Sequence, residues 1–230
     1  MRLLLCSDFS GVGYRYLKNF GEDLNGKTCL FIGYAQEDEF EEESSAALAL
    51  KGLGLNVEFI KKGYKFDKKI DVIFARGGNT TRLLHYLHEY NQYQKIKELI
   101  EQGVIYIGNS AGSIIVGTDT EWTLEAEPYE VDITKKLGKD ALLGYGFIDK
   151  LIFVHCTKYR MARGYEMEMF GGEIFRTLDT DCYPAYLSDL KKYKKDEFIR
   201  IGNNQVYFVD GDTRKTITYD WRHIPVRILD

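Results

Sequence analysis

Short apolar runs alternate with longer amphipathic segments through the first half of this 230-residue chain, and no other feature constrains the fold as strongly. The short runs predict buried strands at 3–6, 28–32, 56–60, 71–75 and 104–107. Helix-length segments lie between them at about 12–22, 41–53 and 80–102. Because each strand-helix-strand step is typical of a parallel pair joined by a right-handed crossover, the pattern predicts an α/β fold with a mostly parallel sheet.

The second half is less regular. Further strands are predicted at 151–154, 183–187, 198–201 and 205–209, and Asn203-Asn204 predicts a hairpin between the last two. No repeat, low-complexity tract or linker divides the chain, and its length suits one substantial core. We therefore expect a single domain over residues 1–230.

Charge and cysteine content exclude several classes of protein. The 31 basic and 35 acidic side chains nearly cancel, so we expect no binding to nucleic acid or to an anionic membrane. The four cysteines lack CxxC spacing, which favours reduced thiols. No apolar stretch approaches the roughly 20 residues that span a bilayer, and the N-terminus is too short for a secretory signal. A cytoplasmic protein is expected.

The sequence Gly108-Asn109-Ser110-Ala111-Gly112 follows the strand predicted at 104–107 and precedes a segment that can open a helix. Small residues on both sides suit a sharp strand-to-helix turn that presents a serine hydroxyl at the carboxyl edge of a sheet. The Ala111 N–H would then point at a developing oxyanion. The motif predicts a nucleophile at Ser110; its alternative is a glycine-rich turn without catalytic function.

A second strand ends in Arg76-Gly77-Gly78-Asn79-Thr80, where bare backbone N–H groups suit the other half of an oxyanion hole, with Gly78 as the donor. An ordinary turn, with Asn79 or Thr80 capping the next helix, is equally consistent. The chain lacks the GxGxxG and GxxxxGK[ST] patterns, so no nucleotide cofactor is expected. No HExxH pattern supports a metal at His85 and His88, and no metal is expected.

The general base is sought among four histidines. His155 follows the strand predicted at 151–154, which would deliver it to the same sheet edge as Ser110. Cys156 is discounted because adjacent residues of an extended segment point to opposite faces. Asp189, at the end of the strand predicted at 183–187, is the candidate acid that accepts the His155 Nδ1–H. Other candidates for this acid are Glu125, Glu127 and Asp210, and a Ser–His pair without a third member is a further alternative.

Together these motifs resemble peptidase family S51, the dipeptidase E (aspartyl dipeptidase) and cyanophycinase-like family. The resemblance rests on the opening 3–7, on 77–80, on 106–112 and on the strand that ends at His155. It implies one doubly wound, flavodoxin-like domain related to class I glutamine amidotransferases, with the catalytic order Ser110, His155, Asp189. Those amidotransferases have cysteine as the nucleophile, so Ser110 argues against a glutaminase.

The resemblance also implies a substrate class, namely short peptides and in particular dipeptides with N-terminal Asp. Such a substrate calls for a nearby cation, and the candidates are Arg76, Arg160 and Arg163, with Asn79 as a further candidate contact. The chain departs from dipeptidase E at Arg76, at Val154 and at Asp189, where that family has Gly, Pro and Glu. The segment 122–145 is longer than its counterpart, so it is interpreted as a lid or as a subunit contact in a homodimer.

Two other functions remain open on the sequence. An α/β-hydrolase esterase would share the serine turn but use Asp189 or Asp210 with the late His223. A non-catalytic ligand-binding protein could use the same fold.

Overall fold

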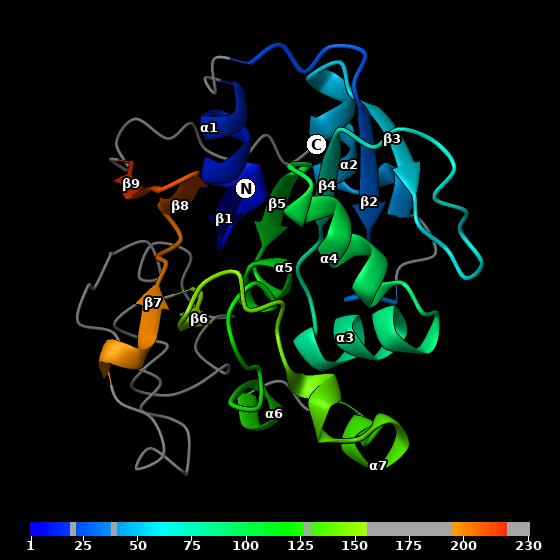
Figure 1. Ribbon diagram of the computed structural model, residues 1–230. Coiled ribbons are helices and arrows are strands. Elements are labelled where there is room, and N and C mark those ends of the chain that lie inside the picture. The colour runs from blue at the N-terminus through cyan, green and yellow to red at the C-terminus, as the bar shows by residue number, and fades with distance from the viewer. Residues whose placement is uncertain (19–21, 38–40, 127–128, 130, 156–194, 220–230) are drawn as a thin grey trace.

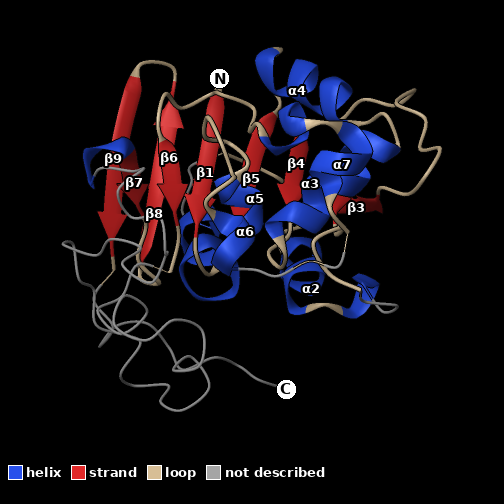
Figure 2. Ribbon diagram, turned by 90° about the horizontal axis from the view of Figure 1, so that it is seen from below, coloured by secondary structure: helices blue, strands red, loops and turns tan. Residues whose placement is uncertain are grey.

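The computed structural model describes residues 1–18, 22–37, 41–126, 129, 131–155 and 195–219. Within these ranges a seven-stranded sheet has the order β3-β2-β4-β5-β1-β8-β9, and β6 and β7 form a second, two-stranded sheet. Figure 2 shows the strands side by side, with β9 at one end and β3 at the other. The strands are β1 (Arg2–Cys6), β2 (Thr28–Ile32), β3 (Asn56–Phe59), β4 (Val72–Ala75), β5 (Ile105–Asn109), β6 (Leu151–Phe153), β7 (Phe198–Arg200), β8 (Gln205–Asp210) and β9 (Thr213–Thr218).

Helices connect β1 to β2, β2 to β3 and β4 to β5, whereas a loop joins β3 to β4, as Figure 1 shows. The helices are α1 (Tyr14–Lys18), α2 (Ser45–Gly52), α3 (Thr80–Glu89), α4 (Tyr93–Glu101), α5 (Ala111–Ile114), α6 (Thr123–Ala126) and α7 (Ile133–Leu137). A π-helical turn at Phe9–Gly13 leads into α1, and 3-10 turns lie at Glu41–Glu43, Lys139–Leu142 and Lys195–Glu197. Among the residues described, no helix has the length and apolar character that crossing a membrane requires.

The five strands from β3 to β1 in the sheet order run parallel to one another, whereas β8 and β9 add two antiparallel strands beyond β1. The expected α/β fold with a mostly parallel sheet is therefore confirmed. Since parallel strands are covered on both faces, their residues are apolar on both sides, as the continuous burial of β4 illustrates.

Two hydrophobic clusters pack on the two faces of the large sheet. One contains Leu4, Phe31 and Phe74 from the strands together with Leu17 of α1 and Leu50 of α2. The other combines alternate strand positions with apolar residues of α3, α4 and α5, among them Leu83, Ile96 and Ile114. Burying each such side chain contributes about 1.5–3 kcal/mol, so both helix layers are held on the sheet mainly by apolar contact.

The helix predicted over 80–102 is two helices, α3 and α4. Asn79 caps α3, since its side chain accepts a hydrogen bond from Arg82 N at 2.8 Å. The interruption falls at Asn91, whose φ of 56° lies in the left-handed region that asparagine tolerates better than most residues. The Gln92 side chain then bonds Tyr34 Oη at 2.9 Å and Lys61 O at 2.8 Å, which fixes the turn.

The hairpin predicted at Asn203-Asn204 is wrong. β7 pairs in parallel with β6, and β8 pairs with β1 and β9, so the two strands belong to different sheets. The chain changes sheet through a turn in which Gln205 N donates to Gly202 O at 3.0 Å. The true hairpin joins β8 to β9 through the two-residue loop Gly211-Asp212, in which Gly211 has a φ of 56°, and a Gly-Asp pair is a local signal for such a loop. The strand predicted at 183–187 lies outside the described residues.

Candidate active site

The carboxyl ends of β1, β4 and β5 meet at one edge of the sheet. Cys6 lies opposite Asn109, and Ala75 lies opposite Gly108. Parallel strands that end together deliver the residues that follow them to one place, which is where ligands bind in open α/β sheets. Here those residues are Ser7, the Gly77-Gly78 turn and Ser110.

Ser110 occupies a strained turn between β5 and α5. Its φ of 50° and ψ of −109° lie outside the conformations that a serine ordinarily adopts. The Ser110 N–H donates to Cys6 O at 2.8 Å, so the strained residue is tied to β1. Such geometry is typical of a nucleophile turn, in which the hydroxyl stands clear of the sheet edge.

The glycines around Ser110 are required by close contacts. A Cβ at Gly112 would lie 2.2 Å from Ala75 O, and a Cβ at Gly77 would lie 2.9 Å from Ser110 Cβ. Gly78 has φ 142° and passes so near Ala35 that a Cβ would lie 2.3 Å from its carbonyl oxygen. The Gly77-Gly78 turn therefore packs directly beside the serine turn.

Two buried hydroxyl groups form hydrogen bonds that hold the Ser110 turn in place. Ser113 Oγ lies 2.7 Å from Gly108 O and accepts from Cys6 N at 3.1 Å, so it bridges β5 and β1. Tyr106 Oη donates to Gly112 O at 2.6 Å, and burial raises the pKa of Tyr106 well above its ordinary value, which keeps this phenol a neutral donor. The Ser110 turn is thus held by hydrogen bonds to the residues before it and after it.

His155 stands where the sequence predicts it, one residue beyond the buried Val154 that follows β6. Its Nε2 lies 2.9 Å from Ser110 Oγ, within hydrogen-bonding distance. Ser110 and His155 are each partly buried. Two residues that are 45 positions apart in the sequence thus have the contact that a serine nucleophile and a histidine base require.

Asn203 contacts the other ring nitrogen. Its Oδ1 lies 2.7 Å from His155 Nδ1. Because an amide oxygen only accepts, this contact requires the proton on Nδ1 and leaves Nε2 as the acceptor for the Ser110 hydroxyl. Sequence reasoning missed this residue, although Asn203 follows β7 just as His155 follows β6, and β6 and β7 are parallel neighbours.

Three other candidates from the sequence, Ala111, Arg76 and Asn79, lie in the described part of the chain near Ser110. Ala111 begins α5, where the first N–H groups of a helix have no intrahelical acceptor. Arg76 is half-buried at the end of β4, and its N–H donates to Ile32 O at 2.9 Å. Asn79 is the helix cap that the alternative interpretation foresaw. The Cys6 thiol donates to Gly108 O at 3.4 Å, and burial raises its pKa well above the ordinary value, so it remains a protonated thiol.

The other candidates named from the sequence fall into two groups. Asp189, Arg160, Arg163, Glu127, Cys156 and His223 lie outside the described residues. Asp210 ends β8 opposite Arg2 and pairs with its guanidinium at 3.7 Å, at the other end of β1 from Cys6. A strand rises about 3.3 Å per residue, so Asp210 lies more than about 10 Å along the strand from the serine turn.

The segment between Ser110 and His155 packs against α3. Tyr145 N donates to Ile115 O at 2.6 Å, which returns the segment to the end of α5. Its middle is tied through His85, whose Nδ1 lies 2.9 Å from Tyr129 Oη and whose Nε2 lies 2.9 Å from Lys136 Nζ. Burial lowers the pKa of His85, and the nearby Lys136 lowers it further. His85 is thus a packing residue of α3 that anchors this segment.

Comparison with known proteins points to one family. The model of peptidase family S51 matches residues 3–217. Peptidase E of Haemophilus influenzae is 36% identical over 128 residues, 51% of this chain and 59% of that protein. A Drosophila melanogaster protein named probable alpha-aspartyl dipeptidase is 35% identical over 122 residues, 48% of this chain and 51% of that protein. The matched part thus spans only half to three fifths of these relatives.

Solved structures share the fold. A Listeria monocytogenes chain, provisionally described as a peptidase E, superposes with a TM-score of 0.69 over 95% of this chain and 98% of its own, at 24% identity. A peptidase from an acI-B1 Actinobacterium superposes with a TM-score of 0.58 at 18% identity, over 95% of this chain and 87% of its own. Since the family model extends from the first strand to the last, the chain belongs to peptidase family S51.

Proposed function

We propose that this chain is a serine peptidase that hydrolyses short peptides as a single domain, with Ser110 as nucleophile and His155 as general base. The observation that carries the proposal is the 2.9 Å contact between Ser110 Oγ and His155 Nε2 on a strained strand-to-helix turn. A serine hydroxyl is a weak nucleophile until a base takes its proton, and the imidazole titrates near neutral pH.

The reaction proceeds by acyl transfer. His155 Nε2 removes the Ser110 proton as Oγ attacks the scissile carbonyl carbon. The imidazolium then gives this proton to the leaving amine, and an acyl-enzyme ester remains on Ser110. His155 Nε2 then takes a proton from a water molecule as this water attacks the ester carbonyl carbon. The imidazolium returns the proton to Ser110 Oγ as the ester bond breaks and the acid product leaves.

The oxyanion accepts hydrogen bonds from the backbone of Ala111 and Gly78 in this scheme. Both belong to turns that pack against each other beside Ser110, which supports the assignment. Losing one such donor typically lowers kcat by about 10²–10³.

Asn203 is proposed as the residue that orients His155. Its amide oxygen at 2.7 Å from Nδ1 supports the tautomer that the mechanism needs. Unlike a carboxylate, an amide carries no charge to stabilise the imidazolium. Asp189, the acid predicted from the sequence, stays the competing candidate.

The substrates proposed are dipeptides, with N-terminal Asp as the first to test. Support comes from the relatives named Peptidase E and probable alpha-aspartyl dipeptidase. Arg76, at the end of β4 beside the Gly77-Gly78 turn, is the candidate cation, together with Arg160 and Arg163, and Asn79 is a further candidate contact. A cytoplasmic location and a homodimer remain part of the proposal.

Replacement of the nucleophile tests the function. The wild-type chain should hydrolyse members of a dipeptide library and react with a serine-directed fluorophosphonate, whereas Ser110→Ala and His155→Ala should lose both activities. Ser45→Ala, an exposed serine of α2, is the matched control and should keep both. Unchanged hydrolysis by folded Ser110→Ala would refute the proposal.

The esterase alternative makes a different prediction. It requires His223 as the base, so His223→Ala would abolish turnover while His155→Ala would not. The pairing of Asp210 with Arg2, away from Ser110, disfavours the version of that scheme that uses Asp210 as the acid. A purely ligand-binding protein would show no fluorophosphonate labelling that depends on both Ser110 and His155.

A further inference from the structure

The hydroxyl of Ser7 joins three segments of the chain next to His155. Ser7 follows β1 and is only 2% exposed. Its Oγ donates to Ile201 O at 2.7 Å and accepts from His155 N at 2.9 Å. One buried group therefore connects the end of β1 with the residue after Val154 and with the residue after β7.

Both hydrogen-bond partners of Ser7 lie in the segments that carry His155 and Asn203. His155 is no longer part of β6, and its φ of 52° is a strained conformation that persists only where surrounding contacts impose it. Ile201 precedes Asn203 by two residues, so the bond to its carbonyl fixes the stretch that presents the Asn203 amide. Ser7 therefore holds both the backbone of His155 and the stretch whose amide oxygen contacts the imidazole.

The same strand end also fixes the nucleophile. Cys6 O accepts from Ser110 N at 2.8 Å, and Cys6 N donates to Ser113 Oγ at 3.1 Å. Cys6 therefore sets the position of Ser110, while its neighbour Ser7 sets that of His155. Two consecutive residues of one strand end thus define the separation between nucleophile and base.

We propose that Ser7 is a positioning residue of the active site, whose hydroxyl holds His155 and the Asn203 stretch at the distance at which the imidazole bridges Ser110 and Asn203. The inference rests on the proposed function of Ser110 and His155. The position needs a small group that both donates and accepts. Alanine offers neither capacity, and without the hydroxyl His155 N–H and Ile201 O lose a buried partner.

Activity measurements provide the first test. Ser7→Ala should lower the fluorophosphonate labelling rate constant and the kcat for any dipeptide substrate by about 10²-fold, because small misplacements of catalytic groups cost about that much. KM should stay within about twofold, since Ser7 is proposed to act through His155 and not on the substrate. Ser7→Thr, which keeps a hydroxyl, should retain most of the labelling rate.

A matched control separates positioning from loss of stability. Thr120→Val removes another fully buried hydroxyl, which donates to Leu142 O at 2.8 Å. We expect this variant to lose stability comparable to that lost by Ser7→Ala and to keep the wild-type labelling rate. Labelling of Ser7→Ala within twofold of wild type, with most of the protein folded, would overturn the proposal.

A spectroscopic test needs no turnover. The side-chain nitrogens of the four histidines can be observed by ¹H–¹⁵N NMR, and His155→Gln identifies the His155 signals. Wild type should have the proton on Nδ1, hydrogen-bonded to Asn203, and Ser7→Ala should give mixed tautomers or exchange-broadened signals. Unchanged His155 signals in Ser7→Ala would contradict the positioning role. If wild type neither hydrolyses peptides nor labels, the proposed function fails, while the NMR comparison still decides the role of Ser7.

Discussion

Backbone strain coincides with the proposed catalytic pair, Ser110 and His155. Three non-glycine residues in the described part of the chain have positive φ, namely Asn91, Ser110 and His155, and two of them are hydrogen-bonded to each other. Such conformations persist only where surrounding contacts impose them. Here β1 supplies those contacts, through Cys6 O to Ser110 N and through Ser7 Oγ to His155 N. The pair is therefore preorganised before a substrate binds.

The orienting residue can be tested by exchange at position 203. Asn203→Leu removes the acceptor at nearly constant volume, and it should lower the fluorophosphonate labelling rate about 10²-fold because the Nδ1 proton is no longer held. Asn203→Asp keeps the acceptor and adds a charge that stabilises the imidazolium, so it should label at least as fast as wild type. Labelling rates at neutral pH check both expectations.

The acid predicted from the sequence supplies the opposing outcome. If Asp189 orients His155, then Asp189→Asn causes the loss and Asn203→Leu leaves labelling unchanged. Wild-type rates for Asp189→Asn together with a loss in Asn203→Leu would assign the role to Asn203.

The sequence predicted the centre of the site better than its rim. Ser110 and His155 were found because a glycine-flanked serine and a histidine after an apolar run are local signals. Asn203 was missed because its role arises from the parallel pairing of β6 with β7, between strands whose first residues are 47 positions apart in the sequence. Ser7 was named only as part of the motif at 3–7. Its contacts were not predicted, because they join three segments that are far apart in the sequence.

At the level of elements, the parallel strands of the first half were predictable because each shows as a short apolar run between longer amphipathic segments. At the antiparallel end, the strand predicted at 205–209 is β8, but its partners and the strand β9 were not predicted. β9 is largely exposed and has no apolar alternation, and the pairing of β8 with β1 spans nearly the whole chain. Propensity and periodicity describe an element but do not determine which sheet it joins.

Because α5 packs closely on β4, one added methyl group at Gly112 should strongly lower both stability and activity. In Gly112→Ala the new Cβ would meet Ala75 O at 2.2 Å, and both are backbone-fixed, so α5 has to move. We expect a loss of about 1–3 kcal/mol in the free energy of unfolding, measured by urea denaturation, and a large loss of labelling at the adjacent Ser110.

Gly52→Ala is the control for this prediction. Gly52 ends α2, and a Cβ there would have no heavy atom within 4 Å. This variant should be unchanged or more stable by about 0.5–1 kcal/mol, because alanine restricts the unfolded chain. Equal effects of the two substitutions would contradict the close packing of α5 on β4.

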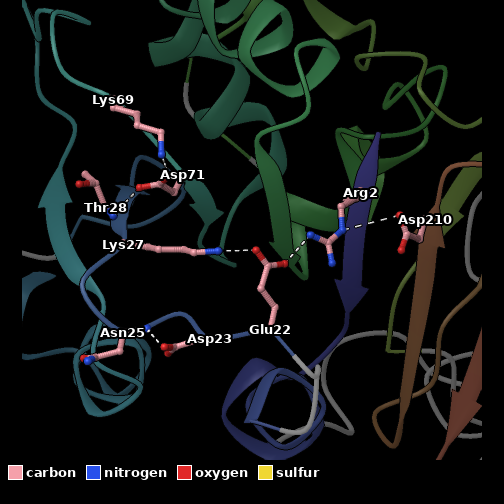
Figure 3. A network of polar contacts seen from close by, with 9 residues as sticks. All are labelled: Arg2, Glu22, Asp23, Asn25, Lys27, Thr28, Lys69, Asp71 and Asp210. Carbon is pink, nitrogen blue, oxygen red and sulfur yellow. Dashed lines mark hydrogen bonds and ion pairs between the residues drawn. The ribbon is translucent and has the colours of Figure 1, made fainter.

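Across the whole molecule, the two ends of the parallel strands carry different kinds of residue. Ser7, the Gly77-Gly78 turn and Ser110 follow the carboxyl ends of the strands, whereas ion pairs gather at the other edge, as Figure 3 shows. There Glu22 pairs with both Arg2 of β1 and Lys27, which precedes β2. Asp71, which precedes β4, pairs with Lys69 at 2.6 Å and accepts from Thr28 N at 3.0 Å. Ion pairs thus link the starts of these strands, at the end of the sheet away from Ser110.

This division predicts a pH-dependent stability that is independent of catalysis. Hydrogen bonding from Lys27, with a further contribution from Arg2, holds the pKa of Glu22 below its ordinary value. A carboxyl whose pKa is lowered by folding stabilises the native state above its unfolded pKa of about 4.3, and this contribution is lost as the pH falls through the folded pKa. Glu22→Gln should therefore cost about 1 kcal/mol at pH 7, since Glu22 is partly exposed and such pairs are weak.

Urea denaturation of wild type and Glu22→Gln across pH 7 to pH 3 measures this contribution. The difference in the free energy of unfolding should shrink toward zero as the pH falls, because a protonated Glu22 resembles glutamine in charge. Glu101→Gln, an exposed carboxyl at the end of α4, should change stability little at any of these pH values. Fluorophosphonate labelling of folded Glu22→Gln should equal that of wild type. Glu22 pairs with Arg2, which also pairs with Asp210 at the start of β1, whereas the serine turn is bonded to Cys6 at the far end of this strand. A difference that persists unchanged at pH 3 would mean that Glu22 stabilises the sheet through packing and not through its charge.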